Sequence, residues 1–175
     1  MEFNTLRNKL YFGGISNGLL SPANIPASGT YDNSYNGGSN DFFVACMDTN
    51  QTFVRSTYIG GAANEVNMMG LNVDLNNDVY VFGYTNSTNF PVTTDALQSK
   101  LNNTSSNGSD PANDKVFFKL PASLNASPLY STYYGGSADD YDPVGERGIK
   151  FSNCRIYTIV TAKSNDIPLT QGAIT

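Results

Sequence analysis

The chain has 175 residues and a formal net charge of −5, and charged residues make up only 14% of it. Its ten Lys and Arg residues are scattered along the sequence. Because a nucleic-acid-binding surface needs clustered basic residues, we expect no nucleic-acid partner. No apolar run approaches the roughly 20 residues that cross a bilayer, so we also expect no membrane insertion.

Short apolar runs of alternating pattern, separated by Asn-, Ser-, Thr- and Gly-rich segments, predict β-strands along the whole chain. The sequence contains 11 Tyr, 10 Phe and 16 Gly, a composition typical of strands and tight turns. No stretch of 10–15 residues shows a helical stripe, so the predicted fold class is all-β. The nine expected strands are 9–15, 41–47, 53–59, 70–74, 78–84, 114–120, 129–134, 148–151 and 155–161.

One short segment occurs twice. The residues STYIGG at 56–61 return 75 positions later as STYYGG at 131–136. Tyrosines at 11, 80 and 157 mark a second recurring strand, and each of these strands is followed by an apolar residue and a proline. Such self-similarity indicates a repeated supersecondary unit. The unit consists of four short antiparallel strands, which describes the blade of a β-propeller.

Residues 1–175 are therefore predicted to form a single β-propeller segment of about two and a quarter repeats. We expect a partial first blade at 9–61, a blade-like unit at 62–136 and a partial unit at 137–175. Because propellers close with about four to eight blades, we interpret the chain as part of a larger propeller. The remaining blades would come from a longer parent chain or, as the alternative, from other copies of this chain.

Three segments resemble, in order, the SBBP-type bacterial β-propeller repeat. They are NGGSNDFFVA at 36–45, STYIGG at 56–61 and VDLNNDVYVFGYTNSTNFPVTTDALQ at 73–98. The sequence departs from the repeat at 150–151, at 159–160 and in the long segment 98–113. The resemblance implies an extracellular, secreted or cell-surface protein, associated with the outer membrane, and it brings no catalytic residues with it.

The loops that follow the glycine pairs are the expected binding face. In an antiparallel meander alternate connections lie on the same edge, so the loops 60–67 and 135–146 should adjoin the long loops 16–40 and 85–113. Long loops are where binding residues gather. The candidate residues on this face are Asn64, Glu65, Phe90 and Tyr141. Its aromatic side chains could stack on sugars or, alternatively, fill gaps between blades.

The densest acidic cluster follows the second glycine pair and consists of Asp139, Asp140, Asp142 and Glu146. Crowded carboxylates favour a cation between them, and calcium takes six to eight oxygen ligands. The cluster is therefore a candidate calcium site. The alternative is that each acid caps backbone N–H groups of its loop. A second acidic segment, 74–78, lacks the later ligands of a calcium loop and is predicted to be a hairpin turn.

The sequence favours a non-catalytic scaffold or interaction module, with adhesion or binding of a protein or surface glycan as its role. The segment 14–18 matches Gly-x-Ser-x-Gly, but the chain has no histidine to act as base. The alternative is a carbohydrate-active enzyme fragment or a carbohydrate-binding module at the mouth of a propeller, and an enzyme would need paired carboxylates at a defined separation. The two cysteines, 46 and 154, are either buried or bridged.

Overall fold

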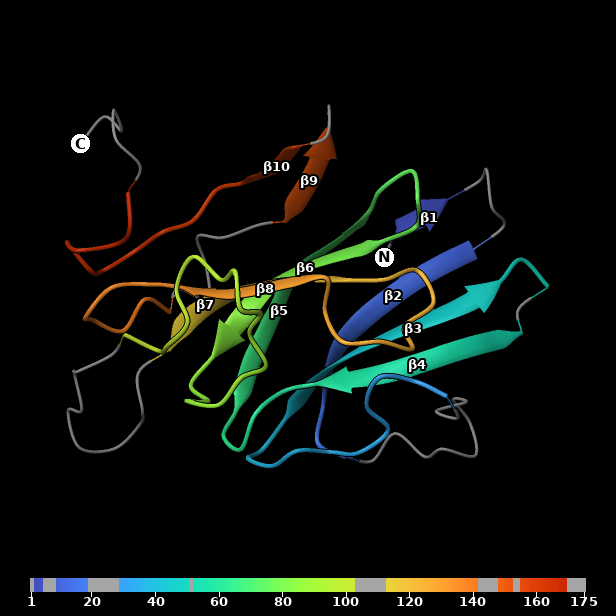
Figure 1. The fold of residues 1–175 in the computed structure, drawn as a ribbon, viewed down its shortest axis with the longest axis horizontal. Helices are drawn as coiled ribbons and strands as arrows, with labels where there is room; N and C mark the ends of the chain where they lie inside the picture. The colour runs from blue at the N-terminus through green and yellow to red at the C-terminus, as the bar shows by residue number, and fades with distance from the viewer. Residues whose placement is uncertain are drawn as a thin grey trace.

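A computed structural model describes residues 2–4, 9–18, 29–50, 52–102, 113–141, 148–152 and 155–169. In these residues every regular element is a β-strand, and all nine strands expected from the sequence are present (Figure 1). An additional short strand, β1, precedes them. The strands are β1 (Glu2–Asn4), β2 (Lys9–Ser16), β3 (Asp41–Asp48), β4 (Phe53–Ile59), β5 (Glu65–Val73), β6 (Val79–Thr85), β7 (Asp114–Leu120), β8 (Tyr130–Tyr134), β9 (Ile149–Ser152) and β10 (Arg155–Thr158).

The strands form three antiparallel sheets in chain order. The first sheet is β1-β2-β3-β4, the second is β5-β6-β7-β8, and the third contains only β9 and β10. Each four-stranded sheet is a simple meander in which consecutive strands are hydrogen-bonded neighbours. This arrangement confirms the all-β prediction of repeated four-stranded antiparallel units.

The turn between β5 and β6 is the predicted hairpin. Asp74 Oδ1 accepts the backbone N–H groups of Asn76 and Asp78, at 2.8 and 3.0 Å. Asn77 has a φ of 66°, a left-handed conformation that asparagine tolerates better than most residues. The acidic residues of 74–78 therefore build a turn, and Lys119 neutralises Asp78 at 2.9 Å.

Strand β5 begins five residues earlier than the sequence indicated. It starts at Glu65 instead of residue 70, and its register with β6 shifts between Glu65 and Asn67 and again between Met68 and Gly70. Each irregularity inserts a residue and breaks the alternation of side chains between the two faces. The period-2 pattern was therefore hidden in this half of the strand, and the loop after the first glycine pair is shorter than expected.

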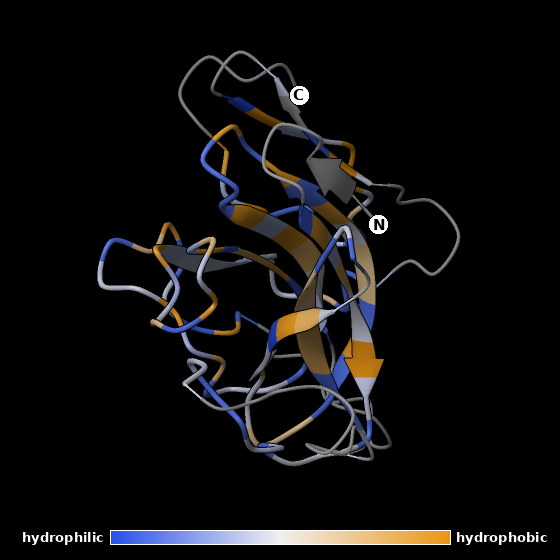
Figure 2. Ribbon diagram, turned by 90° about the vertical axis from the view of Figure 1, so that its right-hand side faces the viewer, coloured by the Kyte–Doolittle hydropathy of each residue, from blue (hydrophilic) through white to orange (hydrophobic). Residues whose placement is uncertain are grey.

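The main core lies between the first and second sheets, which pack face to face. From the first sheet it receives alternate residues of β3, Phe42, Val44 and Cys46, and from the second sheet Val81 and Phe118. Cys46 is a free, buried thiol. Figure 2 shows apolar segments, in orange, along the strands in the interior of the molecule. A second, smaller core lies on the opposite face of the second sheet, where Tyr80 and Phe82 meet Ile149 of β9.

Among the described residues no helix is long and apolar enough to cross a membrane.

Candidate functional site

The loops next to the glycine pairs form one connected edge, as the meander pattern predicted. We call residues 32–40, 60–64, 86–91, 135–141 and 163–168 the Gly-Gly edge. Its loops are tied together by hydrogen bonds from the backbone of one to the side chains of another. Ala63 N–H donates to Ser87 Oγ at 3.0 Å and Ala62 N–H to Asn89 Oδ1 at 2.8 Å. These bonds hold the loops of the edge in one arrangement.

The second repeat has the same bonds. Ala138 N–H donates to Ser164 Oγ at 2.9 Å, and Ser137 N–H donates to Asp166 Oδ1 at 2.8 Å. Because Ser164 and Asp166 occupy the places of Ser87 and Asn89, the Gly-Gly edge is a repeated structure. Its polar side chains are used to position the backbone.

Beneath the first glycine pair lies a buried pair of carboxyl groups. Asp41 is the first residue of β3 and Glu65 is the first residue of β5, so the pair joins the first sheet to the second. Both side chains are fully buried. Asp41 Oδ1 and Glu65 Oε2 have no donor from another group. A methyl group built on Gly60 would overlap Asp41 and lie 2.6 Å from Glu65 Oε2, so only glycine fits above the pair.

Burial and the neighbouring Asp41 raise the pKa of Glu65 to about 8, because both disfavour a second negative charge in this place. The other oxygen of Glu65, Oε1, accepts hydrogen bonds from the hydroxyls of Thr85 and Ser87 at 2.7 and 2.8 Å. At neutral pH Glu65 is therefore protonated, and its proton serves the otherwise unpaired oxygens of the two acids.

The second repeat contains a related pair, Asp114 of β7 and Asp140 of the loop after Gly135 and Gly136. Burial, together with the charge of Asp140, raises the pKa of Asp114 to about 6. Burial alone would raise the pKa of Asp140, but the N–H donors of Gly136 and Ser164 lower it below its usual value. The buried ammonium of Lys115 donates to the backbone carbonyl of Asp140 at 2.8 Å. In this second pair, N–H donors compensate the negative charge of Asp140, whereas Asp41 and Glu65 share a proton.

The two described acids of the candidate calcium cluster, Asp139 and Asp140, accept hydrogen bonds from N–H groups. Asp140 Oδ1 accepts the N–H groups of Lys163 and Ser164, both at 2.9 Å, and Oδ2 accepts Gly136 N–H at 2.7 Å. Asp139 Oδ1 accepts Asn113 N–H at 3.0 Å. Asp142 and Glu146 lie outside the described residues. In the described part of the chain no group of three or more acidic, cysteine or histidine residues could hold a metal ion.

The four candidate binding residues are placed differently from one another. Glu65 lies in β5 and is fully buried, and Phe90 is 3% exposed, packed edge-on against Phe42 and Tyr133. The expectation that these two face a ligand is corrected: Glu65 joins the sheets, and Phe90 fills the gap between them. Asn64 is half-buried and accepts Ser39 N–H through Oδ1. Tyr141 is half-buried against Tyr84.

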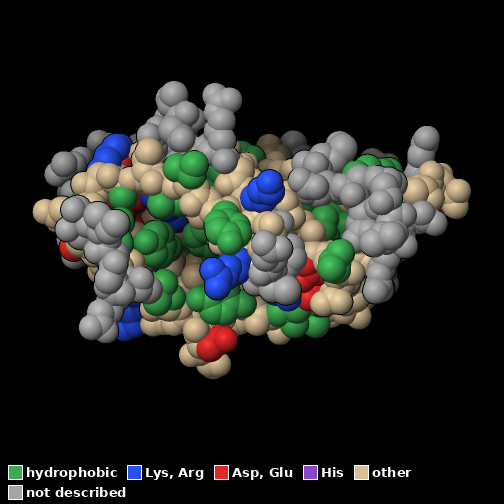
Figure 3. Space-filling model, turned by 90° about the horizontal axis from the view of Figure 1, so that it is seen from above, with side chains coloured by type: hydrophobic (Ala, Val, Ile, Leu, Met, Phe, Trp, Pro, Cys, Tyr) green, Lys and Arg blue, Asp and Glu red, His purple; other side chains and the backbone are tan. Residues whose placement is uncertain are grey.

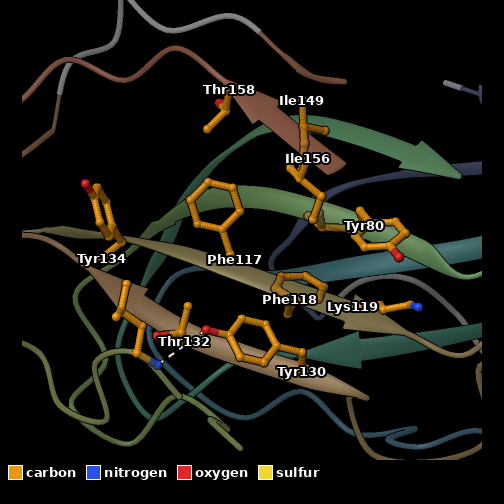
Figure 4. Close-up of a pocket in the computed structure, with 12 residues that line it drawn as sticks. Tyr80, Phe117, Phe118, Lys119, Tyr130, Thr132, Tyr134, Ile149, Ile156 and Thr158 are labelled. Atoms are coloured by element: carbon orange, nitrogen blue, oxygen red, sulfur yellow. Dashed lines mark hydrogen bonds between the residues drawn. The ribbon is translucent and has the colours of Figure 1, made fainter. Parts of the chain in front are cut away.

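A groove of about 470 Å³ opens elsewhere, between the second sheet and the third (Figure 4). Phe117 and Tyr134 of the second sheet point into it, and Ile149, Ile156 and Thr158 of the third sheet lie across from them. The lining is predominantly apolar, with Lys119 and Tyr130 at one end. The sequence alone did not indicate this groove, because it is formed by segments far apart in the chain.

Comparison with known protein families connects this geometry to one of them. The SBBP family, described as a beta-propeller repeat, matches residues 54–91. Residues 54–91 are an SBBP β-propeller repeat. This SBBP repeat runs from β4 across the first glycine pair and through β5 and β6, and it includes Gly60, Glu65 and Ser87. No curated protein matches the chain.

The sequence reasoning missed the residues that join the repeats: Asp41, Asp114, Gly60, Gly135, Ser87, Ser164 and Lys115. A signal for them was present. In both repeats an aspartate opens the third strand, a glycine pair ends the fourth, and an acid follows four or five positions later. Recurrence of all three elements at nearly constant spacing indicates that they form one structural unit.

Proposed function

We propose that this chain is a non-catalytic β-propeller scaffold that binds a protein partner through the Gly-Gly edge. The observation that carries the proposal is the repeated set of hydrogen bonds that fixes the loops of that edge. Loops held in one conformation lose little entropy on binding, which favours a specific partner. The side chains that the edge exposes are mostly amides and hydroxyls, namely Asn33, Ser34, Asn36, Ser39, Thr88, Asn89 and Asn165, and they include the charged Lys163 and Asp166.

The exposed side chains of the Gly-Gly edge suit the binding of a protein better than the binding of a glycan. Glycan-binding surfaces present aromatic rings to solvent, for stacking on sugars. The described aromatic residues of this edge and its border, Tyr31, Tyr35, Phe90 and Tyr141, are all buried or half-buried. The exposed amides and hydroxyls can pair with the backbone groups of a polypeptide.

The burial of the acid pairs supports a non-catalytic role. A glycosidase needs two carboxyl groups that reach the substrate. Asp41 and Glu65 are buried under Gly60, and Asp114 is buried under Gly135. These acids therefore lie at the junctions between sheets, out of reach of a substrate, and the alternative of a carbohydrate-active enzyme fragment has less support.

We further propose that the protein works outside the cell, at the bacterial surface, as an adhesion or assembly module. This location rests on the SBBP-type resemblance. Protease treatment of intact cells of the source organism tests it, since a surface protein is cleaved while a cytoplasmic control protein survives.

Site-specific photo-crosslinking tests the binding face. A photoreactive phenylalanine replaces Thr88, which is exposed on the Gly-Gly edge, or Leu75, which is 74% exposed in the turn on the opposite edge. In cells of the source organism we expect a defined protein adduct from position 88 and none from position 75. The adduct must be identified and must bind the purified chain again. Adducts at both positions, or at position 75 only, would contradict the proposal. Specific binding of the purified chain on a glycan array would show that the partner is a glycan and not a protein.

A further inference from the structure

The two strands of the third sheet reproduce the first two strands of the second sheet. In β5–β6, Asn72 pairs with Tyr80 and Leu71 with Val81. In β9–β10, Lys150 pairs with Tyr157 and Ile149 with Thr158. Residues of β9 follow their counterparts in β5 by 78 positions, and residues of β10 follow their counterparts in β6 by 77 positions. Ile156 is therefore the counterpart of Val79.

Counterpart residues differ sharply in exposure. Val79 and Phe82 are fully buried, whereas their counterparts Ile156 and Ile159 are 42% and 77% exposed. Tyr80 is 9% exposed, and its counterpart Tyr157 is 51% exposed. The face that carries β9 and β10 shows hydrophobic side chains next to Lys and Arg at its surface (Figure 3). Ile156 lines the groove against the second sheet, whereas Tyr157 and Ile159 lie on the opposite face of the third sheet. Apolar side chains exposed on both faces of a strand indicate that further segments pack against it.

In the part of the chain that the structure describes, a missing neighbouring strand explains the exposure of Ile156. The absence of a following sheet from the same residues contributes to that of Tyr157 and Ile159, since Tyr80 and Phe82 pack against Ile149 of the next sheet. In the second sheet β7 pairs along the whole of β6, so that Val79 lies opposite Leu120 and Tyr80 opposite Lys119. Among the described residues β10 pairs only with β9. Its other edge is therefore a row of backbone N–H and C=O groups that can accept a further strand.

The junction between the first and second sheets shows what covers such a face. The face of the first sheet that carries Phe42, Val44 and Ile59 is covered by alternate residues of β6 and β7, including Val116 and Phe118. The corresponding face of the second sheet carries Phe117 and Tyr134, and the described strands that cover it are β9 and β10, with Val160 packed beside them. The groove of Figure 4 lies where the counterparts of Val116 and Phe118 would stand.

We propose that the third sheet binds a β-hairpin with the sequence character of β7–β8. The first strand of this hairpin pairs antiparallel with the free edge of β10, and its alternate apolar side chains fill the groove between β10 and the second sheet. Strand addition of this type obtains affinity from backbone hydrogen bonds and specificity from side-chain pockets. The inference goes beyond the proposed function, because it concerns a different surface and does not depend on the Gly-Gly edge.

The test supplies the hairpin within the chain. Residues 92–136 are attached a second time after Pro168, which corresponds to Pro91. A matched control carries the same extension with Val116→Asp and Phe118→Asp in the added copy only. Hydrogen exchange of the β10 amides is measured in both proteins and in the unextended chain. The β6 amides serve as the internal reference, since their protection shows that the second sheet is folded in every variant.

We expect the β10 amides to exchange fast in the unextended chain, to be protected like those of β6 in the extended chain, and to exchange fast again in the control. A folded extended chain with unprotected β10 would overturn the proposal. Protection of β10 in a control whose β6 is folded would also overturn it, because the apolar fit would then be irrelevant. If β10 is already protected in an unextended chain that light scattering shows to be a dimer, the occupant is a second copy and the hairpin assignment is wrong.

Discussion

Asp41 and Glu65 stand 24 positions apart in the sequence and in different sheets, yet their unpaired carboxyl oxygens lie against the same residue, Gly60. The contact joins the start of the third strand of one sheet to the start of the first strand of the next. Asp114, Gly135 and Asp140 repeat the arrangement at the following junction. The buried acids are therefore part of how consecutive sheets are connected.

The first prediction concerns pH. The pKa of Glu65 is raised from 4.5 to about 8, so the folded state binds a proton that the unfolded state has released. Between about pH 4.5 and 8 the free energy of unfolding should therefore fall as pH rises, at up to about 1.4 kcal/mol per pH unit. Asp114, with a pKa of about 6, adds to the fall between about pH 4 and 6.

Urea unfolding at several pH values between 4.5 and 9 measures this dependence. Glu65→Gln keeps a hydrogen-bond donor without a titrating proton and should flatten the slope above pH 6. The exposed acid Asp95 provides the control, because Asp95→Asn should leave the slope unchanged. A stability of the wild-type chain that rises from pH 6 to pH 8 would contradict the buried acid pair.

The second prediction concerns the glycines above the acids. Gly60→Ala and Gly135→Ala each place a methyl group in overlap with buried carboxyl groups, those of Asp41 and Glu65 at Gly60 and that of Asp114 at Gly135. Overpacking of this kind costs about 1–3 kcal/mol, and we expect both variants at the upper end of that range in urea unfolding. At Gly14 the nearest atoms to an added methyl group belong to the ring of Phe43, at 3.2 Å, so Gly14→Ala is the matched control and should cost clearly less. Equal costs at the three positions would be inconsistent with the close approach described here.

The third prediction concerns calcium. The described acids of the candidate cluster, Asp139 and Asp140, already accept backbone N–H groups. A bound ion would have to displace these donors, so calcium should leave the melting temperature unchanged. Binding at one hundred times the Kd would add about 2.7 kcal/mol of stability, which thermal melting detects easily. A rise of the melting temperature that Asp140→Asn abolishes would restore the calcium site.

Strand positions could be predicted from the sequence where side chains alternate without interruption. Residues 114–120 were predicted at their observed bounds, because Asp114–Leu120 pairs with β6 in one continuous register. Strand β5 was predicted only in its second half, because two irregularities disrupt its pattern. Strand β1 has three residues and too short a pattern to be recognised.

The burial and protonation of the acids between the sheets could not be predicted from the sequence in the same way. Glu65 comes shortly after a glycine pair and directly after the polar Asn64, so it resembled an exposed loop acid. Its burial depends on Asp41, Thr85 and Ser87, which reach it from strands and loops elsewhere in the fold. Only the stacking of the two sheets, a tertiary property, determines its protonation state.

Titration of the Glu65 side chain followed by carbon NMR tests most directly the claim that a buried acid pair joins consecutive sheets. With the carboxyl carbon labelled and assigned through Glu65→Gln, we predict a midpoint at about pH 8 in the folded chain. Asp41→Asn should lower that midpoint, because it removes the neighbouring charge. A midpoint near the ordinary value of 4.5 would show that Glu65 is solvated, and it would contradict the junction between the first and second sheets.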